Sequence, residues 1–190
     1  MEADWEVEIG GQAPIIDACW EGFADLRHSQ DKVALLPEVR EFPGLANALA
    51  LLNSASSPVW TAKCDVWRPP HVDVDELNAR AGEGNCAIAC YIDLLPRADQ
   101  PWPSPENAVD KCQAIIARLR TMPMPCCRAD LIVRRAYVTP DREDVGITAY
   151  LTACGPTCNE SRATLASALH AFVQSVLHAD RSANPASKLQ

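Results

Sequence analysis

DLIVRRAYVTPDREDVGITAYLTA, residues 130–153, is the most informative stretch of this 190-residue chain. Two runs rich in residues that favour β-structure, Asp130–Val138 and Gly146–Ala153, flank the polar linker TPDREDV. A short polar linker between two such runs is typical of a hairpin. The stretch therefore predicts a pair of antiparallel strands, around which the other elements can be placed.

A helix is predicted on each side of this hairpin. The Ser-Pro-Glu sequence at 104–106 is typical of a helix start with serine as the N-cap, and Pro123 stops the apolar stripe that follows. After the hairpin, apolar residues recur at helical spacing between Ser161 and His178, which predicts the last helix.

Toward the N-terminus, hydrophobic spacing predicts further strands and helices. The strands are Trp5–Ile9, Val59–Trp67 and Cys86–Leu95, and the helices are Pro14–Leu26 and Gly44–Asn53. Segment 86–95 is mostly apolar, which is typical of a strand in the middle of a sheet. In segment 59–67, simple alternation places on one face Trp60, Ala62, Cys64 and Val66.

The order of these elements predicts the fold class. Hairpins separated by helices favour an α+β two-layer sandwich, with a mainly antiparallel sheet of about five strands and helices packed on one face. We expect residues 1–180 to form a single α+β domain. The polar segment 181–190 is expected to be a disordered C-terminal tail.

The acidic composition limits the partners that we expect. A net charge of −8 disfavours nucleic acid and anionic membrane surfaces as partners, because both repel carboxylates. The first residues contain no apolar segment typical of a signal peptide, and the apolar run Ala48–Leu52 is too short to cross a bilayer. We expect a cytoplasmic protein whose acidic surface is either simply solvated, the more frequent case, or docks a basic partner.

The nine cysteines are expected to be mostly free thiols, because their number is odd and no export signal accompanies them. Cys154 and Cys158 stand out because Cys-Gly-Pro-Thr-Cys lies between a predicted strand and a predicted helix. In its Gly-Pro pair this motif resembles the active-site turn of thioredoxin-like proteins. Those proteins have two residues between the cysteines, and more strands and helices after them, so the motif does not assign the family.

Two hypotheses follow for this motif. If Cys158 begins the last helix, the helix dipole favours its thiolate, and the pair with Cys154 can perform redox or thiol chemistry. The alternative is a structural turn in which Asn159 caps the helix and the cysteines pack in the core.

Metal binding is not expected. A zinc site would need Cys126 and Cys127 beside Cys154 and Cys158, and adjacent cysteines chelate one ion poorly. We expect no other cofactor.

A second ligand pattern, His71-x-Asp73-x-Asp75, places three potential ligands on one side of an extended chain. Asp73 followed by Glu76 is also typical of a capping box, here for a short helix over Val74–Arg80, and this is the more frequent use of such a pattern.

Two tryptophans are candidate binding residues. Trp67 ends a predicted strand, and the prolines on both sides of Trp102 indicate an exposed loop, where tryptophan serves well as an interface anchor. Tryptophans also serve often as lids over a core. Asp65 and Asp93, on neighbouring predicted strands, could form a carboxylate pair, although strand carboxylates that face solvent are commoner.

No hydrolase, metalloprotease or phosphate-binding motif is present. Our leading hypothesis is therefore a non-catalytic binding or protein-interaction module, which acts on a protein partner or self-associates through a sheet edge or a helix face. The alternative is a thiol-dependent redox protein or enzyme that uses Cys154 and Cys158.

Overall fold

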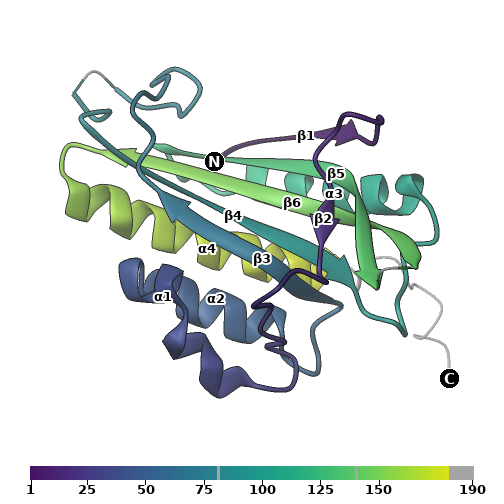
Figure 1. The fold of residues 1–190 in the computed structure, drawn as a ribbon. Helices are drawn as coiled ribbons and strands as arrows, with labels where there is room; N and C mark the ends of the chain where they lie inside the picture. Colours follow the sequence, from purple (N-terminus) through teal and green to yellow (C-terminus); the bar gives the residue numbers. More distant parts are fainter. Residues whose placement is uncertain (81, 140, 180–190) are drawn as a thin grey trace, which may run out of the picture.

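The computed structural model describes residues 1–80, 82–139 and 141–179 (Figure 1). The elements in chain order are β1 (Glu2–Glu8), β2 (Ile16–Asp17), the 3-10 helix η1 (Gln30–Leu35), α1 (Pro37–Glu41), α2 (Gly44–Leu52), β3 (Val59–Trp67), β4 (Cys86–Pro96), α3 (Pro105–Arg120), β5 (Cys127–Thr139), β6 (Arg142–Gly155) and α4 (Cys158–Ala179). The tail predicted over 181–190 lies outside the described residues.

The strands form one six-stranded sheet in the order β1-β5-β6-β4-β3, with β2 beside β5. The predicted hairpin is confirmed as β5 and β6, and the α+β content is confirmed as well. The expectation of a mainly antiparallel sheet of about five strands is confirmed in part, because the pairs β3–β4, β4–β6 and β5–β6 are antiparallel. The sheet has six strands and is mixed, because β1 and β2 both run parallel to β5. Parallel pairing needs a long connection, and here most of the chain separates these partners.

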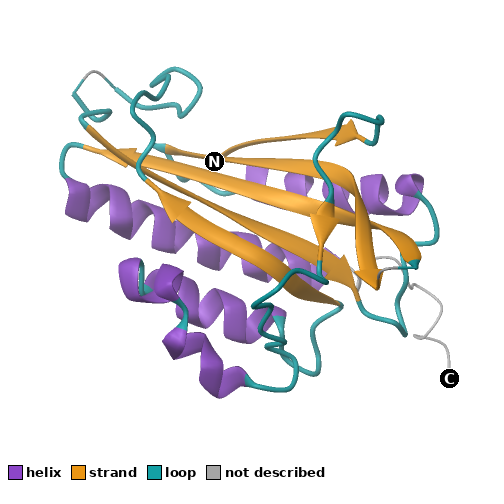
Figure 2. Ribbon diagram, in the orientation of Figure 1, coloured by secondary structure: helices purple, strands orange, loops and turns teal. Residues whose placement is uncertain are grey.

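The helices α3 and α4 lie along one face of the sheet (Figure 2). Both begin and end close to the predicted positions, because their caps and apolar stripes are local signals. The core lies between these helices and the sheet, with α2 packed against α4. Its fully buried large side chains include Phe172, Leu119, Leu131 and Leu151.

The helix predicted over Pro14–Leu26 is wrong. This segment crosses the opposite face of the sheet as an extended chain and turns (Figure 1). Ile16 lies in register with Ala136 on β5, and the amide of Ala18 donates to the carbonyl of Tyr137 at 3.0 Å. Because β5 supplies these hydrogen bonds from far along the chain, local helical spacing did not determine the structure.

The second hydrophobic cluster lies under this crossing segment, on the face away from α3 and α4. Its buried members are Ile16, Ala18, Trp60, Ala62, Leu95 and Ala136. The simple alternation predicted for β3 is wrong between Ala62 and Cys64, because the strand has a register shift between Thr61 and Lys63. Trp60 and Ala62 therefore join this cluster, whereas Cys64 and Val66 pack toward the helices.

Candidate functional site

The face of the sheet away from α3 and α4, here called the open face, is polar over much of its area. On β1, Ala3 is buried toward α3, so the alternate residues belong to the open face. They are all acidic: Glu2, Asp4, Glu6 and Glu8. One end of the open face is covered by the N-terminal segment that includes β2 (Figure 1).

A groove of about 410 Å³ lies where this segment meets the open face. Its volume falls within the range usual for small-molecule and peptide pockets. The residues that line it come from the N-terminal segment and from four strands, and they are Pro14, Ile15, Ile16, Asp17, Trp20, Lys63, Tyr91, Asp93, Arg134, Thr148 and Tyr150.

Asp93 is the buried carboxyl of this groove, with 7 % of its surface exposed. Thr148 on the neighbouring strand donates its hydroxyl proton to Oδ1 of Asp93 at 2.6 Å. Its other oxygen, Oδ2, has no hydrogen-bond partner among the residues that the structure describes. Burial raises the pKa of Asp93, while the Thr148 hydrogen bond and the charges of Arg134 and Lys63 act in the opposite direction.

Arg134 crosses the floor of the groove and is fully engaged within the protein. Its guanidinium donates to Glu8 Oε2 at 2.8 Å, to the Tyr150 hydroxyl at 3.2 Å and to Thr148 Oγ1 at 3.4 Å. It also lies over the Tyr150 ring, 5.6 Å from the centroid. These partners make Arg134 a support for the groove and not a free cationic ligand-binding group.

Three aromatic rings extend from the groove across the open face. Tyr91 and Tyr150 lie opposite each other on β4 and β6, with ring centroids 5.8 Å apart. Trp67 contacts both rings, at 6.2 and 6.4 Å. Trp67, predicted as a binding residue, therefore lies beside the groove and belongs to one continuous aromatic surface on the open face.

The buried position of Asp93 predicts a pH-dependent stability effect. Asp93→Asn should raise the melting temperature near pH 8, because the raised pKa means that the ionised carboxylate destabilises the folded state there. The gain should vanish below about pH 3.9, where Asp93 is protonated in both states. Thermal unfolding at both pH values measures this. Asp65→Asn, at an exposed position on β3, is the matched control and should change little; equal gains in both variants would contradict the prediction.

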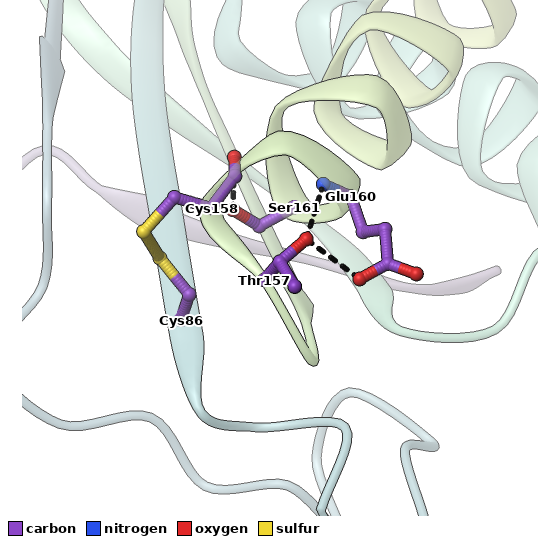
Figure 3. Close-up of a disulfide and its surroundings, with 5 residues drawn as sticks. All are labelled: Cys86, Thr157, Cys158, Glu160 and Ser161. Carbon is purple, nitrogen blue, oxygen red and sulfur yellow. Dashed lines mark hydrogen bonds between the residues drawn. A yellow bond between two sulfur atoms is a disulfide. The ribbon is translucent and has the colours of Figure 1, made fainter.

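The cysteine pair predicted from sequence is not formed. Cys158 is bonded to Cys86 at the start of β4 (Figure 3). Cys154 is a buried free thiol. In the sheet, Ala87 lies opposite Cys154, while Cys86 lies opposite Gly155. Since successive strand residues point to opposite faces, Cys86 and Cys154 project to different sides of the sheet.

The start of α4 is capped by Thr157 and not by Asn159 as expected. The amide of Glu160 donates to Thr157 Oγ1 at 3.3 Å, and Thr157 Oγ1 donates to the Glu160 carboxylate at 2.7 Å (Figure 3). Cys158 is the first residue of α4, as the thiolate hypothesis required, but its sulfur is in the disulfide.

The thiols at this end of the sheet are not activated. Burial raises the pKa of Cys126 to about 11 and that of Cys127 to about 11, and it also raises the pKa of Cys154. A thiol with a raised pKa holds its proton at neutral pH and is a weak nucleophile.

Within the described residues, no group of three histidine, cysteine or acidic side chains could hold a metal ion. His71, Asp73 and Asp75 are all exposed, and Asp73 Oδ1 accepts a hydrogen bond from the amide of Asp75 at 2.9 Å. The short helix predicted over Val74–Arg80 is wrong, because these residues form turns with Asn78 at a φ of 50°.

Trp102 is a core residue, and the expectation of an exposed loop position is wrong. It is 5 % exposed and belongs to the main hydrophobic cluster. It lies beside a small hollow between the sheet and the helices, whose lining includes Leu94, Ile115, Ile147 and Val176. The flanking prolines shape the loop, but the ring itself is buried.

Sequence reasoning missed most of the groove. Tyr91 and Asp93 alternate with Ile92 and Leu94 in a strand predicted to be mostly apolar, where Asp93 alone stands out as a carboxylate. Period-two spacing of polar residues within an apolar strand indicates one wet face, and this was the available signal. That Arg134 reaches the same groove depends on strand order and register.

No protein-family model, curated protein or solved structure matches this chain. In the part of the chain that the structure describes, no helix combines the length and hydropathy needed to span a membrane.

Proposed function

We propose that this protein is a non-catalytic binding module whose ligand site is the groove on the open face. In this proposal, α3 and α4 form one layer and the sheet the other, which leaves the open face to bind a protein partner. The main support is Asp93, a buried carboxyl that lines the groove with one oxygen unpartnered among the described residues. This oxygen reaches the surface of the groove, since it is not among the fully buried side-chain atoms that lack a partner in the described residues, and a buried carboxyl with a raised pKa in a cleft is a frequent feature of functional sites.

The aromatic side chains support the same proposal. Tyr91, Tyr150 and Trp67 form a continuous surface, and Trp20 at the groove is 40 % exposed. Exposed aromatic side chains beside a polar anchor are typical of binding sites. A second copy of the chain is one form that the protein partner can take.

The alternative of a thiol-dependent redox protein has less support. It requires Cys154 and Cys158 to act together, and Cys158 is bonded to Cys86. A cytoplasmic location stays a prediction; the many free thiols favour it, whereas a disulfide is commoner in oxidising compartments.

The proposal is tested by narrowing the groove. Ile15 lines the groove and is 40 % exposed. The larger side chain of Ile15→Trp should fill part of the groove and lower the affinity for any ligand that binds there by about tenfold. The probes are a library of short peptides and small polar aromatic compounds, and binding is read from NMR shifts of the Tyr91 and Tyr150 rings.

Leu35→Trp is the matched control, because Leu35 is an exposed apolar residue that does not line the groove. It should leave binding unchanged. If no probe perturbs the two tyrosine rings, or if both variants weaken binding equally, the groove is not the ligand site.

A further inference from the structure

We propose that the groove accepts a cationic side chain, the guanidinium or ammonium group of a basic peptide segment, at the free oxygen of Asp93. This inference rests on the proposed function and specifies its ligand class. It depends on which hydrogen-bonding groups of the groove are already used, on the faces of its aromatic rings and on the charge around it.

The groove offers an acceptor to a ligand. Asp93 keeps one oxygen without a partner among the described residues, and it is held in place by the hydrogen bond from Thr148. A carboxylate accepts hydrogen bonds only, so the group that best satisfies it is a charged N–H donor. Fixing the carboxylate before binding also reduces the ordering cost of association.

The cations already present do not satisfy this oxygen. The guanidinium of Arg134 is occupied by Glu8, Thr148 and Tyr150. Lys63 lies directly opposite Asp93 on β3, but its side chain is exposed and forms no ion pair within 4 Å among the described residues. The described residues therefore leave this oxygen of Asp93 to a ligand cation.

The aromatic rings favour the same ligand. A cation is attracted to the face of an aromatic ring, and Tyr91 and Tyr150 lie on the strands that present Asp93 and Thr148. This chain already places guanidinium groups in this way, with Arg134 over Tyr150 at 5.6 Å and Arg27 over Trp60 at 3.9 Å.

The surrounding charge favours a peptide with several cations over a single small amine. Asp65 lies opposite Tyr91, and Asp130 lies opposite Tyr150, so carboxylates flank the tyrosine pair on both sides. Arg128 neutralises part of this charge, through an ion pair with Asp130 at 2.8 Å. The acidic residues of β1 recur every second position, a spacing of about 7 Å that alternate side chains of an extended peptide also have.

The test uses three fluorescein-labelled peptides, tetra-arginine, its neutral isostere tetra-citrulline and tetra-glutamate, at about 0.15 M salt, where remote charges are screened. Tetra-arginine should bind with the highest affinity. Tetra-citrulline should bind at least about tenfold more weakly, because it keeps the shape but lacks the charge. Fluorescence anisotropy gives the affinities.

Asp93→Asn should lower the affinity for tetra-arginine by about tenfold or more, because the amide keeps the shape of the carboxylate and loses its charge. Glu41→Gln is the matched control, because it removes one exposed carboxylate from α1, outside the groove and the open face, and should change the affinity less than twofold. Equal effects of the two variants, or equal binding of the arginine and citrulline peptides, would overturn the inference.

A second variant distinguishes a loss of binding from a folding defect of Asp93→Asn. Tyr91→Leu removes a ring face and keeps Asp93, and it should lower the affinity for tetra-arginine about threefold or more. If neutral or anionic probes shift the tyrosine resonances while tetra-arginine does not, the ligand class is wrong and the groove is still a binding site. If no probe shifts them, both proposals fail.

Discussion

Removal of the Cys86–Cys158 disulfide should lower the free energy of unfolding by about 4 kcal/mol. The bond joins residues 72 apart in sequence and ties the start of β4 to the start of α4. A link across so long a loop restricts the unfolded chain strongly, which is the main source of the expected effect. The double variant Cys86→Ser/Cys158→Ser, unfolded in urea without reductant, measures it.

Cys19→Ser is the control for this prediction, because Cys19 is exposed and free and its loss should change stability by less than about 0.5 kcal/mol. A reductant should bring the wild type close to the double variant. Thiol titration of the unfolded, unreduced wild type should find seven free thiols, the nine cysteines less the bonded pair. A count of nine would contradict the disulfide.

Trp102→Ala should lower the free energy of unfolding by about 3–5 kcal/mol. The ring fills space between the sheet and the helices, where it is 5 % exposed, so truncation removes buried apolar surface and leaves a cavity. Urea unfolding followed by circular dichroism gives the loss. Trp102→Phe should lower the free energy of unfolding by less, because most of the ring volume is kept.

Trp67→Ala is the contrasting variant, because Trp67 is half-buried on the open face and belongs to no core cluster. Its loss removes contacts with two tyrosine rings, worth about 0.5–1.5 kcal/mol each, and creates no core cavity. A loss below about 1 kcal/mol for Trp102→Ala, together with a changed oligomeric state, would instead favour the interface role expected from the sequence.

The candidate site shows why binding residues were harder to predict than helices. Asp93 was recognised as a strand carboxylate, but its proposed partner Asp65 lies diagonal to it, because Asp93 faces Lys63 and Asp65 faces Tyr91. The residue that donates a hydrogen bond to Asp93 is Thr148, 55 positions away. Hydrogen bonds between strands depend on register, which a single sequence does not specify.

The same limitation applies to the cysteines. Cys154 and Cys158 are close in sequence and suggested a pair, yet Cys158 is bonded to Cys86 and Cys154 is a free thiol. Cys86 approaches Cys158 because β4 pairs with β6, and α4 begins three residues after β6 ends. Proximity in sequence indicated the right region but not the bond.

The sequence by itself determined the elements whose signals are local. The apolar stripes of α3 and α4, the start of α3 after Ser104, the apolar run of β4 and the two halves of the hairpin depend on neighbouring residues, and they formed close to the predicted positions. The cap of α4 did not, because Thr157 takes the role expected of Asn159. Tertiary structure alone decided the parallel pairing of β1 and β2 with β5, the extended course of residues 14–26 and the convergence of Asp93, Thr148 and Arg134 on one groove. These features depend on hydrogen bonds and packing between segments far apart in the chain, and such contacts can override a local preference.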